Sequence, residues 1–269
     1  ELEGLSDVAM GKPTSATAAA VTASIDRAVK AVGARTAGGI VTLPIQNDVL
    51  VDAGFAHPGH TEYLEKLTAD MPLPKGVERG AVMILTAGPF RVVPVTLHVP
   101  LAKVPELVTV ERIVRTGLIT AQAMVRDYGI AQPRIAVAGL NPHAGEGGKI
   151  GTEEREVILP AIKKLRDRGI EAAGPFPADT MFHEEARSKY HVALCMYHDQ
   201  ALAPIKSVAF HAAINTTLGL PIVRTSPDHG TGLDIAGKGI ARPDSLINAI
   251  YSADRMVTAR KNFNHATNG

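Results

Sequence analysis

Three histidines stand where the chain could gather a metal ion. His98, His143 and His198 each follow the carboxyl end of a predicted strand. Ligands collect at those ends in open α/β sheets, so three imidazoles far apart in the sequence can converge there. Neutral imidazoles hold a divalent ion and leave open positions for substrate oxygens. The long spacing matches no compact metal motif, so position alone leaves open three unrelated loop histidines, or a hydrolase in which the ion activates water.

A second group of side chains could bind a phosphate or a carboxylate. Arginine grips an oxyanion with two hydrogen bonds, lysine acts as a point charge, and a helix start offers free N–H groups. Each of these residues, taken alone, could equally be solvated surface. Lys206 and Arg224 carry more weight because they lie beside apolar, strand-like segments. The full set is Lys206, Arg224, Asn215 and the pair His60 and Thr61, with Thr61 as the expected cap of a helix.

Strands that alternate with helices must position these residues. The pattern predicts an α/β protein with a largely parallel core and some antiparallel pairing. Gly88-Pro89 predicts a hairpin, and Pro94 places its second strand at a sheet edge or a bulge. Helices are expected at 14–32, 61–67, 104–128, 153–168 (kinked at Pro160) and 244–261, a loop or short helix at 46–58, and strands at 39–43, 81–86, 92–97, 134–140, 191–196 and 222–224.

Composition excludes several classes of function. A net charge of +1, 4% aromatic residues and no tryptophan argue against nucleic acid as the main partner. No apolar stretch reaches the ~18 residues that a membrane-spanning helix needs. The single cysteine, Cys195, excludes an internal disulfide and indicates a reducing, cytoplasmic location. Its apolar surroundings favour a buried small hydrophobe over a nucleophile.

Two glycine-rich segments mimic nucleotide-binding motifs. Residues 232–239 resemble a phosphate-binding P-loop, but Gly239 stands where Ser or Thr should bind magnesium. The glycines at 145, 147, 148 and 151 have the wrong spacing for a Rossmann fingerprint. Signatures of serine and cysteine hydrolases are also missing. Any nucleotide is therefore bound by another device.

Six segments resemble the 4-hydroxythreonine-4-phosphate dehydrogenase family of vitamin B6 synthesis, in the family's order, over about residues 9–255. The resemblance implies that His98, His143 and His198 bind a divalent ion, such as zinc, magnesium or cobalt. It also implies that His60, Thr61, Lys206, Asn215 and Arg224 contact a small phosphorylated substrate. The family is a homodimer whose active site draws on both subunits. The segments are 59–62, 139–148, 177–182, 196–200, 215–221 and 224–231.

Residues 229–241 also resemble the adenosine-binding loop of isopropylmalate and isocitrate dehydrogenases. That resemblance implies their two-domain fold, with mostly parallel sheets, and NAD or NADP bound through the loop. We expect residues 1–57 and 222–269 to form a discontinuous cofactor domain, and 58–221 a domain for metal, substrate and dimerisation. The chain begins at Glu1, not Met, and the family's N-terminal strand and helix have no counterpart in it. The loop contacts expected are His229, Gly230, Asp234 and Gly237.

The resemblance implies the oxidation of 4-phosphooxy-L-threonine to a β-keto acid, which decarboxylates to 3-amino-2-oxopropyl phosphate. Lys206 is the first candidate for proton transfer and Asp179 the second, although both could only orient the substrate. A related dehydrogenase of a phosphorylated four-carbon sugar acid or of a carboxylated cyclic diol stays open. So does a metal-binding protein without activity, because Asn47 stands where the family usually has a lysine.

Overall fold

The structure is a computed structural model that describes residues 9–57 and 59–268; Glu1 and Pro58 lie outside the described residues. Its centre is a mixed sheet of eight strands in the order β1-β8-β7-β2-β3-β6-β4-β5. The described strands are β1 (Ile40–Val41), β2 (Val82–Ala87), β3 (Phe90–Pro94), β4 (Arg134–Ala138), β5 (Glu171–Phe176), β6 (Val192–Cys195), β7 (Ile214–Leu218) and β8 (Arg224–Pro227).

The pairing confirms the predicted α/β class with a mostly parallel mixed sheet. Strands β3, β6, β4 and β5 are parallel neighbours, and β1 runs parallel to β8. Strand β2 is antiparallel to both of its neighbours, β3 and β7, and β7 is antiparallel to β8. The predicted hairpin at Gly88-Pro89 is therefore the β2–β3 turn. All eight strands join one sheet, and the two-domain division stays a prediction.

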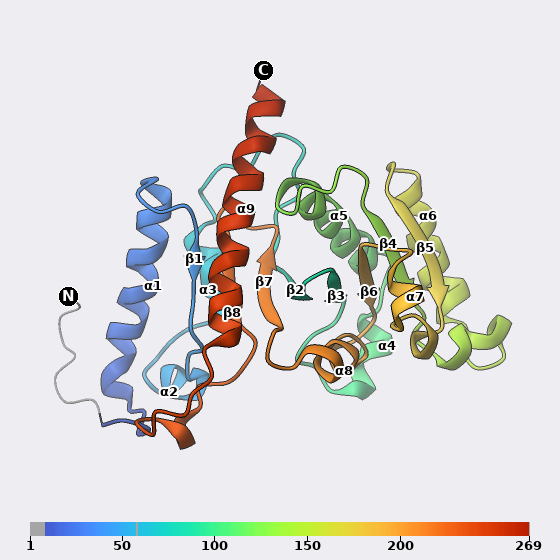
Figure 1. Ribbon diagram of the computed structural model, residues 1–269. Helices are drawn as coiled ribbons and strands as arrows, with labels where there is room; N and C mark the ends of the chain where they lie inside the picture. Colours follow the sequence, from blue (N-terminus) through green and yellow to red (C-terminus); the bar gives the residue numbers. More distant parts are fainter. Residues whose placement is uncertain (1–8, 58, 269) are drawn as a thin grey trace.

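Helices cover both faces of the sheet, which gives three layers (Figure 1). Helices α5 and α6 pack on one face of β2–β6, and α8 packs on the other. Beside β1 and β8, α9 covers one face and α1 with α3 the other. The described helices are α1 (Ala18–Gly33), α2 (Asn47–Asp52), α3 (His60–Leu67), α4 (Val104–Leu107), α5 (Val110–Arg126), α6 (Leu159–Arg166), α7 (Glu184–Arg187), α8 (His198–Ala209) and α9 (Asp244–Asn268).

Several local expectations were wrong, each for a physical reason. The helix predicted over 104–128 is interrupted at Thr109, whose extended backbone and side-chain oxygen cap α5 by accepting from the Arg112 N–H at 3.2 Å. Thr61 caps nothing, because α3 already begins at His60. Strand β3 is internal, and Pro94 is tolerated there because β2 pairs only as far as Val92.

Two strands, β5 and β7, and two helices, α7 and α8, were missed. In β5 the Gly174-Pro175 pair breaks the strand pattern, and in β7 the polar residues Thr216 and Thr217 are both buried, so no alternation marks the strand. Helix α8 contains Pro204. The helix predicted over 153–168 is divided: a π-helical turn, Glu154–Ile158, precedes α6, and Pro160 lies in the first turn of α6, while the bend predicted at Pro160 stays a prediction.

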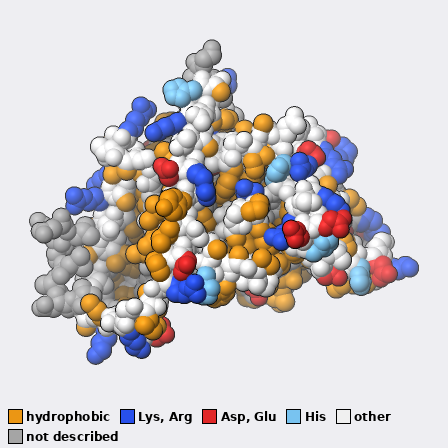
Figure 2. All heavy atoms as spheres, viewed as in Figure 1, with side chains coloured by type: hydrophobic (Ala, Val, Ile, Leu, Met, Phe, Trp, Pro, Cys, Tyr) orange, Lys and Arg blue, Asp and Glu red, His pale blue; other side chains and the backbone are white. Residues whose placement is uncertain are grey.

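The outer surface of α9 is partly apolar. Ile247, Ile250 and Tyr251 are exposed on it, and Figure 2 shows hydrophobic side chains as a patch over this helix. Among the described residues, no helix has the length and apolar character to cross a bilayer.

Candidate functional site

Two of the three predicted metal ligands face each other. The rings of His98 and His198 have centroids 5.7 Å apart. They line a hollow of about 320 Å³ together with Thr96, Val104 and Tyr197. Strands β3 and β6 are parallel neighbours, so their carboxyl ends lie at the same edge of the sheet and bring the two rings together.

Hydrogen bonds beyond the strand ends hold the segments that carry these two histidines together. The Val95 N–H donates to Cys195 O at 2.7 Å, and the Thr96 hydroxyl donates to Met196 O at 2.8 Å. His198 is the first residue of α8, and its Nδ1 lies 2.6 Å from Asp199 Oδ1. The carboxylate orients the imidazole and leaves Nε2 as the nitrogen for a ligand.

Gln200 ties the ends of β6 and β4 together. Its side-chain oxygen accepts from the Met196 N–H at 2.6 Å, and its side-chain nitrogen donates to Gly139 O at 2.7 Å. The side chain is buried, so both bonds are protected from water. Strand β4 is the parallel neighbour of β6, and the chain therefore continues to His143 from the same edge of the sheet.

His143 does not join the other two histidines within the chain. It is exposed on a turn, Pro142–Gly148, in which residues 143 to 147 all have left-handed backbone angles. Among residues 9–57 and 59–268, no group of three or more His, Cys, Asp or Glu side chains could hold a metal ion. The chain alone thus provides a pair of imidazoles, and the role of His143 stays a prediction.

A buried carboxylate holds this left-handed turn. Glu154 Oε1 accepts from the backbone N–H groups of Leu140 and Asn141 at 2.8 and 2.7 Å, and its Oε2 accepts from the Asn141 amide at 3.0 Å. Left-handed geometry is unfavourable for His143, Ala144 and Glu146, which carry a Cβ atom. The bonds to Glu154 offset part of that cost and set the direction in which the turn projects.

Of the predicted anion ligands, His60 lies near Arg224, whereas Lys206 pairs with Asp228. The Arg224 guanidinium is buried and donates to the Thr42 hydroxyl at 2.9 and 3.1 Å and to the Thr217 hydroxyl at 3.0 Å. Burial lowers its pKa to about 10. Both partners are neutral, and among the described residues no carboxylate pairs with Arg224, so its charge lacks a counter-ion.

His60 and Asn215 provide two further buried polar atoms, and the group Arg224, His60 and Asn215 is called the anion pocket. Burial and the nearby Arg224 charge lower the pKa of His60 to about 4, so the ring is neutral near pH 7. Its Nε2 is buried without a hydrogen-bond partner, and so is Asn215 Oδ1. Asn215 lies two residues before Thr217 on β7, hence on the face of the strand that meets Arg224. Thr61 follows His60 in the first turn of α3 and is half-buried.

The two candidates for proton transfer differ in surroundings. Lys206 Nζ lies 3.0 Å from Asp228 Oδ2, and both side chains are mostly shielded from water. Lys206 belongs to the same helix as His198, eight residues later, which is about 12 Å along the helix axis. Asp179 is exposed on a short turn, Ala178–Thr180, that packs beside the His143 turn.

The predicted cofactor loop is open to solvent. His229, Gly230 and Gly237 are exposed, and Asp234 lies in a single turn, Leu233–Ile235, that follows the left-handed Gly232. The Thr231 hydroxyl donates to the Gln46 side chain at 3.0 Å and so joins the loop to the start of α2.

Sequence reasoning missed Thr42, Asp228, Glu154 and Gln200. Asp228 and Gln200 stand inside segments that resemble the family, but nothing in their type marks a role.

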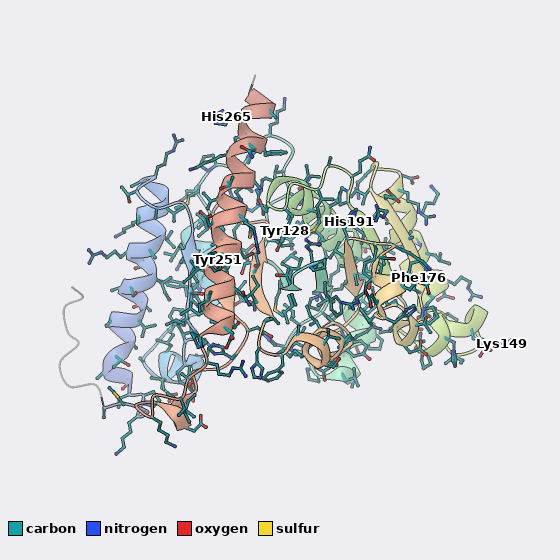
Figure 3. All side chains as sticks on the ribbon, viewed as in Figure 1. Tyr128, Lys149, Phe176, His191, Tyr251 and His265 are labelled. Atoms are coloured by element: carbon teal, nitrogen blue, oxygen red, sulfur yellow. The ribbon has the colours of Figure 1, made fainter. Side chains whose placement is uncertain are left out.

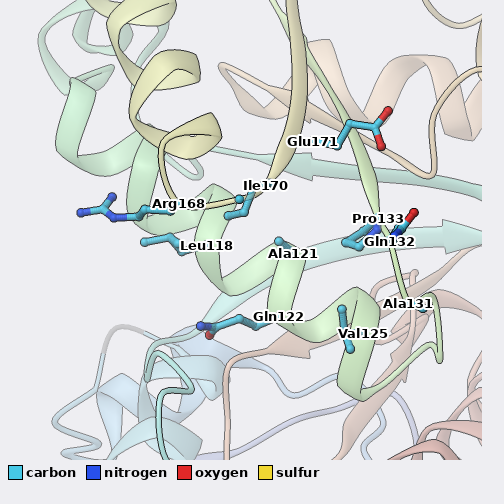
Figure 4. A pocket seen from close by; sticks show the side chains of 11 residues that line it. Leu118, Ala121, Gln122, Val125, Ala131, Gln132, Pro133, Arg168, Ile170 and Glu171 are labelled. Carbon is cyan, nitrogen blue, oxygen red and sulfur yellow. The ribbon is translucent and has the colours of Figure 1, made fainter.

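A separate depression of about 530 Å³, lined by Leu118, Gln122 and Glu171 among others, lies where β4 and β5 begin (Figure 4). Because it is at the opposite ends of these strands, it is remote from the histidine pair.

A family profile described as "Pyridoxal phosphate biosynthetic protein PdxA" matches residues 2–253. The chain belongs to the PdxA family. A 4-hydroxythreonine-4-phosphate dehydrogenase of Caulobacter vibrioides is 53% identical over 256 residues, which cover 95% of this chain and 76% of that protein. One from Bradyrhizobium diazoefficiens is 55% identical over 93% of this chain and 71% of its own length.

Solved structures agree with this membership of the PdxA family. The 4-hydroxythreonine-4-phosphate dehydrogenase of Klebsiella pneumoniae superposes with a TM-score of 0.83 at 34% identity, over 95% of this chain and 76% of its own. A terephthalate 1,2-cis-dihydrodiol dehydrogenase of Burkholderia xenovorans reaches a TM-score of 0.66 at 28% identity, over 96% of this chain and 79% of its own.

Proposed function

We propose that this PdxA-family chain is an NAD(P)-dependent dehydrogenase that oxidises 4-hydroxythreonine 4-phosphate in pyridoxal phosphate biosynthesis. The observation that carries the proposal is the pocket around Arg224, where a buried guanidinium without a counter-ion meets the unpartnered His60 and Asn215. Such a pocket fits a phosphate group, whose oxygens accept several charge-assisted hydrogen bonds at once. The names of the similar proteins support the same substrate.

The histidine pair fits a divalent cation. Two imidazoles face each other, and the Nδ1 of His198 is already held by Asp199. His98 and His198 would hold the ion, with His143 supplied by a second copy of the chain in a homodimer. Such an ion stabilises negative charge on a substrate hydroxyl oxygen as its proton leaves.

The remaining chemistry falls to side chains of the chain. Arg224, His60 and Asn215 bind the phosphate, and Thr61 adds a donor at the start of α3. Lys206 Nζ takes up the proton of the hydroxyl in its neutral form, after its ammonium proton has passed to the paired Asp228 carboxylate 3.0 Å away. The loop that contains His229, Gly230, Asp234 and Gly237 would hold NAD or NADP, which would supply the hydride acceptor. The β-keto acid product then loses carbon dioxide to give 3-amino-2-oxopropyl phosphate.

A metal-reconstituted assay that follows reduced nicotinamide tests this proposal. Turnover of 4-hydroxythreonine 4-phosphate is expected in wild type. Lys206→Ala should lower kcat, because proton transfer by a positioned side chain typically contributes about 100- to 10,000-fold. Unchanged turnover at saturating substrate would remove Lys206 from this role. No hydride transfer with any candidate substrate would overturn the proposal and leave a hydrolase or an inactive metal-binding protein.

The second candidate is a carboxylated cyclic diol. The likeness to the terephthalate dihydrodiol dehydrogenase favours it, although that structure superposes less well than the Klebsiella enzyme. A phosphorylated four-carbon sugar acid is a third substrate for the same pocket. Assays of all three substrates side by side with the wild type show which one is turned over. The same assays with Arg224→Gln should show a strong loss only for the phosphorylated substrates.

The single buried cysteine supports a cytoplasmic location for this enzyme. Cys195 is fully buried in β6, and burial raises the pKa of its thiol, so it is inert packing and not a nucleophile.

A further inference from the structure

A second polar cavity, of about 600 Å³, lies between α9 and the turn that joins β2 to β3. Arg91, Tyr128, Ile214, Arg255 and Met256 are among its lining residues. Figure 3 labels Tyr128 next to α9. The cavity shares no lining residue with the hollow at His98 and His198. Arg91 is the second residue of β3, whereas His98 lies four residues beyond its end, a separation of roughly 23 Å if the chain is fully extended.

Positive charge dominates this cavity. Arg91 is largely buried, which lowers the pKa of its guanidinium, and the neighbouring charge of Arg255 acts in the same direction. Among the described residues, neither arginine forms an ion pair. The one carboxylate in the lining, Asp127, is occupied by Arg126 and Arg260 at distances of 2.7 to 3.1 Å. An anion in the cavity would therefore meet two unneutralised guanidinium groups.

Arg91 is held in place before any ligand binds. The Arg91 guanidinium lies 5.2 Å from the centroid of the Tyr128 ring and donates to the carbonyls of Pro89 and His191 at 3.2 and 3.3 Å. Its Nε is buried without an acceptor. The hydroxyls of Tyr128 and Thr216 lie beside each other, and neither has a well-formed hydrogen bond among the described residues. Burial raises the pKa of Tyr128 to about 12, so its hydroxyl keeps its proton and can donate.

We propose that this cavity binds a small organic monophosphate at a site distinct from the substrate pocket. The phosphate lies between Arg91 and Arg255, and its apolar body packs on Ile214 and Met256. A phosphate fits better than a carboxylate, because the cavity presents donors from β3 and α9 beside the Tyr128 hydroxyl, and a phosphate offers three acceptor oxygens. Preformed sites with an apolar wall and few convergent polar groups are typical of small-ligand binding.

Calorimetric titration of the full chain with phenyl phosphate tests the site. Phosphate also fits the Arg224 pocket, so wild type is expected to bind two equivalents, and Arg255→Gln to lose one of them or to weaken it at least about tenfold, as for a hydrogen bond to a charged group. Arg255 is exposed, so this variant should fold. Lys261→Gln is the matched control, because it removes the same charge from α9 outside the cavity.

A second variant and a second probe make the result decisive. Arg91→Gln should lose the same equivalent, whereas Arg224→Gln should lose the other one. Benzoate, a monoanion with a similar ring, should bind the cavity more weakly than phenyl phosphate. Equal binding by wild type, Arg255→Gln and Arg91→Gln, or an equal loss in Lys261→Gln, would each overturn the proposal. A single equivalent in wild type that Arg224→Gln removes and Arg255→Gln retains would overturn it as well.

Discussion

Arg224 is the side chain of the anion pocket whose charge is buried without a counter-ion. Its buried guanidinium donates only to neutral hydroxyls, so the free protein bears a desolvation cost that a bound phosphate would offset. The same charge helps to keep the nearby His60 neutral. Both residues therefore act on stability and on binding, and the two effects can be separated by experiment.

Replacing Arg224 with Gln should weaken the binding of the phosphorylated substrate far more than it lowers the stability of the fold. We expect KM to rise about 10- to 100-fold, because a hydrogen bond to a charged group contributes ~1.5–3 kcal/mol. Steady-state kinetics with a phosphorylated substrate measures this. A KM equal to that of wild type would show that the phosphate binds elsewhere.

His60 should make the protein less stable in mild acid. Its pKa is lowered from 6.5 to about 4 by burial and by Arg224, so the unfolded chain binds more protons between these values, and stability falls as pH drops through this window. The contribution is about 2 kcal/mol between pH 6.5 and 5, at ~1.4 kcal/mol per pH unit. Urea unfolding at pH 7 and pH 5 should show a smaller loss for His60→Gln than for wild type; parallel losses would contradict the assignment.

At the scale of an element, the left-handed turn at 142–148 depends on close packing against Glu154. A Cβ atom at Gly145 would lie 2.5 Å from Glu154 Oε2, whereas one at Gly147 would meet nothing within 4 Å. Both glycines have positive φ, +76° and +67°. The two glycines differ in the room available to an added Cβ atom and not in backbone conformation, so they form a matched pair for comparison.

Gly145→Ala should therefore cost more stability than Gly147→Ala. Each substitution adds a Cβ atom in the left-handed region, at about 1–2 kcal/mol. Only Gly145→Ala also displaces the Glu154 carboxylate, and we expect about 2 kcal/mol more from the disturbed hydrogen bonds. Thermal unfolding of both variants gives the difference, and equal destabilisation would show that Glu154 does not support the turn.

Glu154 itself should control the mobility of the turn. In Glu154→Ala we expect faster amide hydrogen exchange at residues 140–148, because two backbone N–H groups lose their acceptor. Glu156→Ala is the control, since Glu156 is exposed in the same helical turn and bonds only to Thr152 and Arg155. Equal rates of amide hydrogen exchange in both variants would show that contacts other than those of Glu154 keep the turn rigid.

At the scale of the whole molecule, the homodimer proposed above can be tested through the separation of His143 from the pair formed by His98 and His198. Mixed dimers of His98→Ala and His143→Ala should regain about a quarter of wild-type activity, because half of the dimers are mixed and one of their two sites is intact. Each variant alone should be inactive. Co-expression followed by the nicotinamide assay measures this, and no recovery would place all three ligands in one chain.

The sequence by itself determined the fold class, the hairpin and the expectation that histidines gather at strand ends, because apolar periodicity and turn residues are local signals. Adjacent parallel strands then confirmed that β3, β6 and β4 lead to His98, His198 and His143 from one edge. Likewise, the apolar run around Cys195 was enough to place it in the core.

Only the tertiary structure decided which of these side chains meet. His98 and His198 face each other, whereas His143 is exposed on a turn held by Glu154, a residue 11 positions later in the chain. Thr42 reaches Arg224 across 182 positions, and Asp228 pairs with Lys206. The burial of these side chains, their hydrogen-bond and ion pairs, and the unpaired charge of Arg224 all arise from contacts between distant segments. No local sequence pattern encodes such contacts.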